Sequence, residues 1–211
     1  MTTAFNSVSL YRKVRRVNLI ALSVVGSALL LQVPASAISI RVSPIGAPLV
    51  IALFIALGLP SALGFGLSSG LPAQESVAAR RIRRYDAVLV TSSVCAFLAL
   101  GAIGAQVSAG LNASDVGDTY LIATRALMTY LGWLLIARFF AGWRTASIAP
   151  ALYLLAVGVF GFADETAAAG WAWIGLPVAD GWAWACTSIL LALGTALWAW
   201  RPNWSIEVRA S

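Results

Sequence analysis

Long apolar runs separated by short polar segments dominate this chain. Each of six runs is roughly long enough for a helix to cross a membrane, and none alternates apolar and polar residues with the period of two that is typical of barrel strands. The runs cover residues 18–38, 47–67, 87–107, 119–140, 147–163 and 182–200. The pattern therefore predicts an all-α membrane protein whose residues 18–200 form six transmembrane helices.

A short amphipathic stretch precedes the first run. In "FNSVSLYRKVRRVN", a helical wheel places Leu10, Val14 and Val17 on one face and the basic residues on the other. This predicts an interfacial helix on the cytoplasmic side within residues 1–17, while a disordered basic tail fits the same composition. The basic start, the apolar middle and the small residues up to Ala37 also imitate a secretory signal, but we expect this segment to be retained as a helix.

Composition agrees with a membrane protein and sets its orientation. The chain is 60% hydrophobic and 10% charged, with a mean hydropathy of +0.86, which is too apolar for the polar surface of a soluble domain. The Lys and Arg residues, 14 against 8 Asp and Glu, gather at the ends of apolar runs, so we interpret them as topology determinants rather than nucleic-acid contacts. With a cytoplasmic N-terminus, all except Arg41 and Arg125 fall inside, which predicts that residues 201–211 are a cytoplasmic tail.

The densest cluster of charge lies in the stretch "ESVAARRIRRYDAVLV", residues 75–90. On a helical wheel, Ala78, Ile82, Tyr85 and Leu89 share one face and four arginines occupy the rest. This predicts an amphipathic cytoplasmic helix within residues 68–86 that leads into the third span. It would either anchor the chain to anionic lipid head groups or present guanidinium groups to carboxylates of a soluble partner.

The layout as a whole resembles a known family. An interfacial helix, six spans with both termini inside and a charged helix between spans two and three are similar to the membrane (permease) subunits of ABC-2 type ATP-binding-cassette exporters, of the small actinobacterial kind. The stretch "ATRALMTYLGWLLIARFFAGWRTASIAPALYLLAVGVFG" is similar to spans four and five of such subunits, with a basic turn before a proline, Pro150, that opens the next helix.

This resemblance implies a function in transport. The helix between spans two and three would be a coupling helix in a groove of a cytoplasmic ATP-binding subunit, whose closure would push this helix and rock spans one, two and five. A second six-span chain, the same or different, would complete the route for an amphiphilic substrate, in the cytoplasmic membrane of a bacterium. The positions that would dock the ATPase are Glu75, Arg80, Arg81, Arg83 and Arg84.

The outer side offers a second group of candidate residues. Arg125 lies within the fourth span, where a charge is usually paired or faces water, and Asp118, Asp164 and Glu165 are predicted at a similar height. Arg125 would pair with these acids, contact an anionic substrate or extend to the interface. The outer loop 164–181 and the residues directly after it carry four tryptophans, Trp171, Trp173, Trp182 and Trp184, which fit either a partial hairpin in the interface or an aromatic belt on an ordinary loop.

Catalysis by this chain is not expected. The sequence has no histidine, which excludes Ser/His catalysis and imidazole metal sites, and its Cys95 and Cys186 lack the spacing of a redox or zinc site. It also lacks a phosphate-binding G-x-x-x-x-G-K-[ST] loop, so nucleotide would bind the partner, and we expect no metal or cofactor. Two alternatives remain: a substrate-capturing membrane component of an energy-coupling-factor importer, and a non-transporting membrane accessory or immunity protein.

Overall fold

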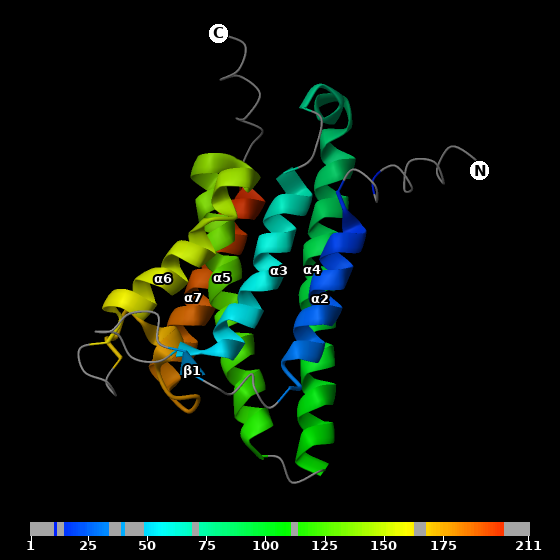
Figure 1. Ribbon diagram of the computed structural model, residues 1–211. Coiled ribbons are helices and arrows are strands. Elements are labelled where there is room, and N and C mark those ends of the chain that lie inside the picture. The colour runs from blue at the N-terminus through cyan, green and yellow to red at the C-terminus, as the bar shows by residue number, and fades with distance from the viewer. Residues whose placement is uncertain are drawn as a thin grey trace.

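The computed structural model describes residues 11, 15–33, 39–40, 49–68, 72–110, 114–162 and 168–200, and within residues 72–83 it describes the helical backbone. These residues form a helical bundle, so the predicted all-α class is confirmed (Figure 1). The elements are α2 (Val17–Leu30), β1 (Ser39–Ile40), β2 (Leu49–Val50), α3 (Ile51–Ser68), α4 (Pro72–Gly110), α5 (Ser114–Ala146), α6 (Ala149–Phe160), the 3₁₀-helix η2 (Trp173–Gly175) and α7 (Gly181–Trp200). The two-residue strands pair antiparallel, with Ser39 opposite Val50.

Helix α5 forms the centre of the bundle. Helices α3 and α7 pack along it, α4 and α6 also contact it, and α2 packs against α3 and α4. Buried apolar residues of α5 recur every three or four positions and form a broad face: Ala123, Ala126, Leu127, Tyr130, Leu131 and Leu134. Side chains of α5 can therefore reach most other elements of the fold.

Two glycines bring α5 and α7 close together. A Cβ atom on Gly194 would lie 2.9 Å from the carbonyl oxygen of Gly132, and a Cβ on Gly132 would lie 3.0 Å from the carbonyl carbon of Leu190. Small residues at such crossings let helix backbones approach, and the resulting van der Waals packing contributes to helix association in lipid. The close approach holds the first turns of α7 against the face of α5 that carries Arg125 and Thr129.

Four helices are long and apolar enough to cross a membrane: Ile51–Ser68, Arg84–Gly104 within α4, Gly117–Ala146 within α5, and Gly181–Trp200. Four of the six predicted spans are thus confirmed as helices of sufficient length. The first and fifth are shorter than predicted, because α2 has 14 residues and α6 has 12. At about 1.5 Å per residue they extend roughly 21 and 18 Å, against about 30 Å for the hydrocarbon core.

Local sequence explains both short helices. Four residues after Leu30 comes Pro34, whose ring would clash with the Leu30 carbonyl in a continued helix. Helix α6 begins at Ala149 with a proline in its first turn, so the prediction that Pro150 opens this helix is confirmed. Upstream, Gly142 has a φ of 74°, which breaks α5 within the predicted turn at residues 141–146.

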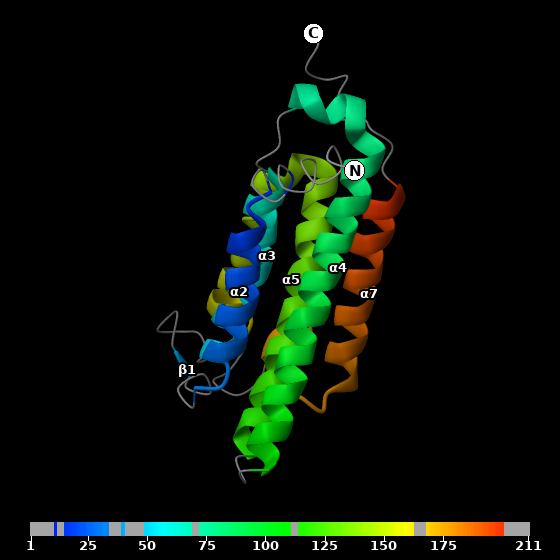
Figure 2. The ribbon, with the colours of Figure 1, turned by 90° about the vertical axis from the view of Figure 1, so that its right-hand side faces the viewer.

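The ends of the bundle differ in charge. The start of α2, the end of α3, the N-terminal part of α4, the end of α5 and the end of α7 meet at one end, which we call the basic end (Figures 1 and 2). Most residues of the predicted interfacial helix, and the predicted tail 201–211, lie outside the described residues. The opposite end carries η2 and the start of α7. Residues 168–180, which include η2, are called the cap segment below.

Candidate functional site

The predicted docking positions all fall on the N-terminal part of α4, at the basic end. Figure 2 shows the first turns of α4 running across the end of the bundle, at an angle to the rest of the helix. This part is one continuous helix with the third span, not a separate element. The side chain of Arg84 is exposed, and those of Glu75, Arg80, Arg81 and Arg83 lie outside the described part. On the helical backbone, residues 80 and 84 are one turn apart and share a face.

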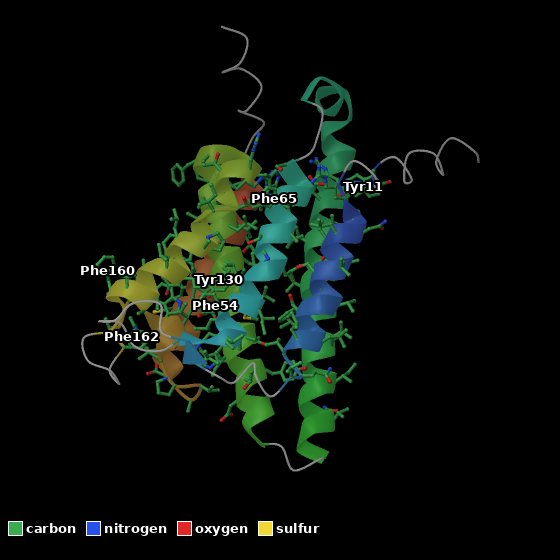
Figure 3. All side chains as sticks on the ribbon, viewed as in Figure 1. Tyr11, Phe54, Phe65, Tyr130, Phe160 and Phe162 are labelled. Atoms are coloured by element: carbon green, nitrogen blue, oxygen red, sulfur yellow. The ribbon has the colours of Figure 1, made fainter. Side chains whose placement is uncertain are left out.

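A buried ion pair lies directly after this arginine cluster. Asp86 on α4 pairs with Arg15, which precedes α2: Arg15 Nε lies 3.3 Å from Asp86 Oδ1, and Arg15 Nη2 donates a hydrogen bond to Asp86 Oδ2 at 3.3 Å. The hydroxyl of Tyr11 also donates to Asp86 Oδ1, at 2.8 Å. Both charged side chains are almost fully buried, at 5% and 8% exposure. Figure 3 shows Tyr11 beside the start of α2.

The same network reaches a third element. Arg15 Nη1 donates to the carbonyl oxygen of Leu67 near the end of α3. That carbonyl lies in the last turn of α3, where carbonyl oxygens have no N–H partner within the helix. The guanidinium group therefore ties the start of α2 to the end of α3 and to α4, just below the arginine cluster.

A cation–π contact also joins α5 and α7 at the basic end. The guanidinium carbon of Arg138 on α5 lies 4.0 Å from the ring centroid of Trp143 and 5.7 Å from that of Trp198 on α7. Arg138 is also within electrostatic reach of Asp86. Such contacts stabilise by about 0.5–2 kcal/mol, depending on how far the cation is desolvated. The basic end thus joins α2, α3, α4, α5 and α7.

At the opposite end, Arg125 is buried with 1% exposure and binds the cap segment. Its Nη1 donates to the carbonyl oxygen of Pro177 at 2.8 Å, and its Nη2 donates to the carbonyl oxygens of Ile174, at 3.3 Å, and Leu176. The guanidinium carbon also lies 6.0 Å from the Trp184 ring centroid. These carbonyls belong to the short η2 and to the irregular backbone after it, and such backbone needs partners when it is buried in protein.

Further polar contacts hold the cap segment against the helices. Trp173 Nε1 donates to Thr129 Oγ1 on α5 at 3.2 Å, and the Thr129 and Thr187 hydroxyls lie 3.0 Å apart. The amide of Ala183 donates to Asp180 Oδ1 at 3.0 Å, so Asp180 caps the start of α7. The described part of the tryptophan-rich loop therefore folds back onto the bundle, with the side chains of Trp171 and Trp182 exposed. Whether it forms a partial hairpin in the interface or an aromatic belt stays a prediction.

The acidic residues predicted near Arg125 are not brought to it in the described structure. Asp118 is exposed and lies two turns before Arg125 on the same helix, and Asp164 and Glu165 lie outside the described residues. The acid within electrostatic reach of Arg125 is Asp180, which the sequence analysis did not assign to it. The sequence signal was the N-cap pattern of an aspartate just before the α7 run. The contacts of Asp86 were missed as well, because its partners Arg15 and Tyr11 lie 71 and 75 positions away in the sequence.

Three buried side-chain atoms of α5 have no hydrogen-bond partner in the described structure. They are Arg125 Nε, Tyr130 Oη and Trp133 Nε1. Within the same described ranges, no group of three His, Cys, Asp or Glu side chains is placed to hold a metal ion. The side chain of Cys95 is exposed and that of Cys186 is half-buried. The polar chemistry at this end is therefore that of hydrogen-bond donors and one buried cation.

Comparisons of this chain with known protein families, with curated proteins and with solved structures find no match.

Proposed function

We propose that the chain is the transmembrane permease subunit of an ATP-driven exporter, which docks a cytoplasmic ATP-binding subunit through residues 75–86 at the start of α4. The support begins with helix length. Helix α4 has 39 residues, but its apolar window, Arg84–Gly104, has only 21. The preceding turns carry the arginine cluster beyond the apolar region, where a soluble partner can reach it.

The observation that carries the proposal is the buried network next to the cluster. Asp86 follows the exposed Arg84 by two residues on the same helix, and it holds Arg15 before α2 and, through Arg15, the last turn of α3. A displacement of the docking turns must therefore move or break contacts with α2 and α3. A simple lipid anchor needs no such connection, whereas a coupling element needs one.

The charge distribution supports a cytoplasmic basic end. The exposed arginines Arg16, Arg84 and Arg144 all belong to helix ends that meet there. Short loops rich in Lys and Arg stay on the cytoplasmic side during insertion into a membrane. The proposed orientation places both termini inside, the cap segment outside, and a second permease chain beside this one.

Purification of the tagged full chain from its native membranes in mild detergent tests the proposal. We expect a nucleotide-binding subunit in about equal copies, identified by mass spectrometry. The double variant Arg81→Glu/Arg84→Glu should lose this subunit at least tenfold, which corresponds to about 1.4 kcal/mol of binding free energy. The matched control, Arg16→Glu/Arg144→Glu, makes the same charge change at exposed positions of the same end and should retain it.

Three results would reject docking by α4. These are recovery of the chain without any nucleotide-binding subunit, equal loss from both double variants, and a reversed orientation of the docking variant in the membrane. Orientation is read with a membrane-impermeant thiol reagent from the labelling of single cysteines placed in the basic end and in the cap segment. Recovery with membrane proteins alone would instead favour the accessory function.

A further inference from the structure

Side chains supply hydrogen bonds to much of the backbone of the cap segment. Six of its carbonyl oxygens accept a hydrogen bond from a side chain: those of Gly170, Trp171, Ile174, Leu176, Pro177 and Val178. The donors come from α5, α6 and α7, and they are Arg125, Tyr153, Trp182 and Trp184. A loop in water can leave its carbonyls to the solvent, whereas irregular backbone at membrane depth must find its donors within the protein.

The side chains of the cap segment are apolar as well. Residues 168–179 are all Ala, Gly, Trp, Ile, Leu, Pro or Val, so none of them is charged and none carries a hydroxyl or an amide. Part of this segment is open to its surroundings, because Trp171 is 43% exposed and Pro177 and Ala179 are exposed too. Connecting loops in water are usually rich in polar residues, so this composition is typical of a segment that faces lipid.

The length of α6 limits how far from the basic end the cap segment can start. Helix α6 begins three residues after α5 ends at the basic end, and its 12 residues rise about 18 Å. The Ala169 amide donates to the Gly161 carbonyl oxygen at 2.7 Å, and Phe162 forms an antiparallel bridge with Ala168. The cap segment therefore starts beside the end of α6, roughly 12 Å short of the far side of a hydrocarbon core of about 30 Å. In Figure 1, α6 is inclined to α5 and α7, which places its end deeper still.

Contacts with α7 give a second, independent depth. Helix α7 has 20 residues and extends about 30 Å, the thickness of the core. Thr187 lies six positions after Gly181, the first residue of α7, and thus about 9 Å into the helix. The Thr187 hydroxyl lies 3.0 Å from that of Thr129, which accepts a hydrogen bond from Trp173 Nε1 at 3.2 Å. The indole of Trp173 therefore lies well inside the core, in agreement with the limit set by α6.

We infer that the cap segment lies inside the hydrocarbon of the leaflet at its end of the bundle, where it continues the membrane span that α6 leaves short. Its exposed surface, formed by Trp171, Pro177 and Ala179, contacts the acyl chains of lipids. The opposite arrangement is a bilayer that thins beside α6 and leaves the cap segment in water. The inference concerns the chain alone, so it depends neither on the orientation of the chain nor on an ATP-binding subunit.

Electron paramagnetic resonance of a spin-labelled cysteine tests the depth. The full chain, with Cys95→Ser and Cys186→Ser, carries one nitroxide at Gly170→Cys in liposomes of dioleoyl phosphatidylcholine and phosphatidylglycerol. Gly170 is exposed, and a Cβ there would lie 3.9 Å from its nearest neighbour, so the position has room for the label. The measured quantity is the ratio of nitroxide collisions with oxygen, which dissolves in lipid, to collisions with a water-soluble nickel chelate. We expect a ratio about threefold or more above that of a label in water, because the hydrocarbon core holds no water.

Two exposed positions calibrate the collision ratio. Ile189→Cys lies eight positions after Gly181, about 12 Å into α7, and Ile189 is 68% exposed, so its label reports the lipid-facing value. Gly110→Cys is at the exposed last residue of α4, six positions beyond the apolar window that ends at Gly104, so its label reports the value outside the core. Thermal unfolding of each labelled variant, compared with that of the unlabelled chain, checks that the fold is retained.

The collision ratio of Gly170→Cys decides between the two arrangements. A ratio nearer to that of Ile189→Cys supports the inference. A ratio nearer to that of Gly110→Cys would overturn it and would show that the bilayer thins beside α6 instead. If the Gly170→Cys variant does not fold, Trp171→Cys takes its place under the same criterion. The measurement uses no ATP-binding subunit, so its result and that of the exporter test are independent.

Discussion

Two buried arginines, Arg15 at the basic end and Arg125 at the cap end, have their charges compensated in different ways. Both are at most 4% exposed, and both donate hydrogen bonds to backbone carbonyls. Arg15 has in addition a carboxylate partner, Asp86, at 3.3 Å, whereas Arg125 has three carbonyls and an unpaired Nε. One charge is neutralised within the protein and the other only in part.

The Arg15 site is a structural junction whose charge is compensated, whereas the hydrogen bonding of Arg125 is incomplete. A buried charge is costly to leave without a counter-charge, so the Arg15 network acts as a unit that joins α2, α3 and α4. Around Arg125, carbonyl oxygens accept hydrogen bonds from three of the five guanidinium N–H groups, and among the described residues Arg125 Nε, Tyr130 Oη and Trp133 Nε1 have no partner. The charge of Arg15 is compensated by a carboxylate in contact with it, whereas the charge of Arg125 meets neutral carbonyl groups and, at longer range, Asp180.

The largest expected effect is at the basic end. Asp86→Ala leaves Arg15 buried without its counter-charge, which should lower the free energy of unfolding by about 3–5 kcal/mol. The measurement is unfolding of the full chain in dodecyl maltoside as denaturing detergent is added. Arg15→Met/Asp86→Leu, which replaces both charges with apolar groups, should recover most of the loss. A cost for Asp86→Ala below about 1 kcal/mol would mean that the pair is solvated.

A smaller and more local effect is expected at the cap end. Arg125→Met removes the donors to the carbonyls of Ile174, Leu176 and Pro177, and should cost about 2 kcal/mol. Because these contacts hold only the cap segment, amide hydrogen exchange should rise within residues 170–180 and stay unchanged around Asp86. Arg125→Lys should recover only part of the protection, since an ammonium group lacks the planar fork. If hydrogen exchange rose equally at both ends, the contacts of Arg125 would not be local to the cap segment.

The smallest effects distinguish two threonines beneath the cap segment. Thr187→Val breaks only the hydroxyl contact with Thr129 and should cost about 1 kcal/mol. Thr129→Val also leaves Trp173 Nε1 without its acceptor, so it should cost more, up to about 3 kcal/mol. Thermal unfolding of both variants checks the order. A larger loss in Thr187→Val would show that Trp173 does not depend on Thr129.

Much of the fold could be predicted from apolar run length, because a membrane span needs a minimum number of helical residues. The four long helices follow from this rule. Helices α2 and α6 do not, since a run of apolar residues continues past the point where the helix ends. The signals were single residues, Pro34 after α2 and Pro150 in the first turn of α6, which count little in a hydropathy window.

The sites were less predictable, because their partners are distant in sequence or belong to the backbone. Arg125 could be singled out as a charge within a span, but its acceptors are carbonyl oxygens about 50 positions away, which any residue could supply. Asp86 looked like the end of a charged loop until Arg15 and Tyr11 were placed beside it. The arginine cluster was visible as composition, and its function stays a prediction.

Because α6 is short, the apolar surface that it presents is less tall than the apolar surface of α4. The apolar window of α4 has 21 residues and extends about 32 Å, whereas α6 has 12 and extends about 18 Å. By helix length alone, lipids beside α6 would have to shorten or tilt their chains, at a cost of a fraction of a kcal/mol per Å of mismatch. Because α2, at about 21 Å, is also shorter than α4, a bilayer that followed the six helices alone would have to thin beside both α2 and α6. Neighbouring membrane proteins with equally short apolar surfaces would then be favoured beside these two helices.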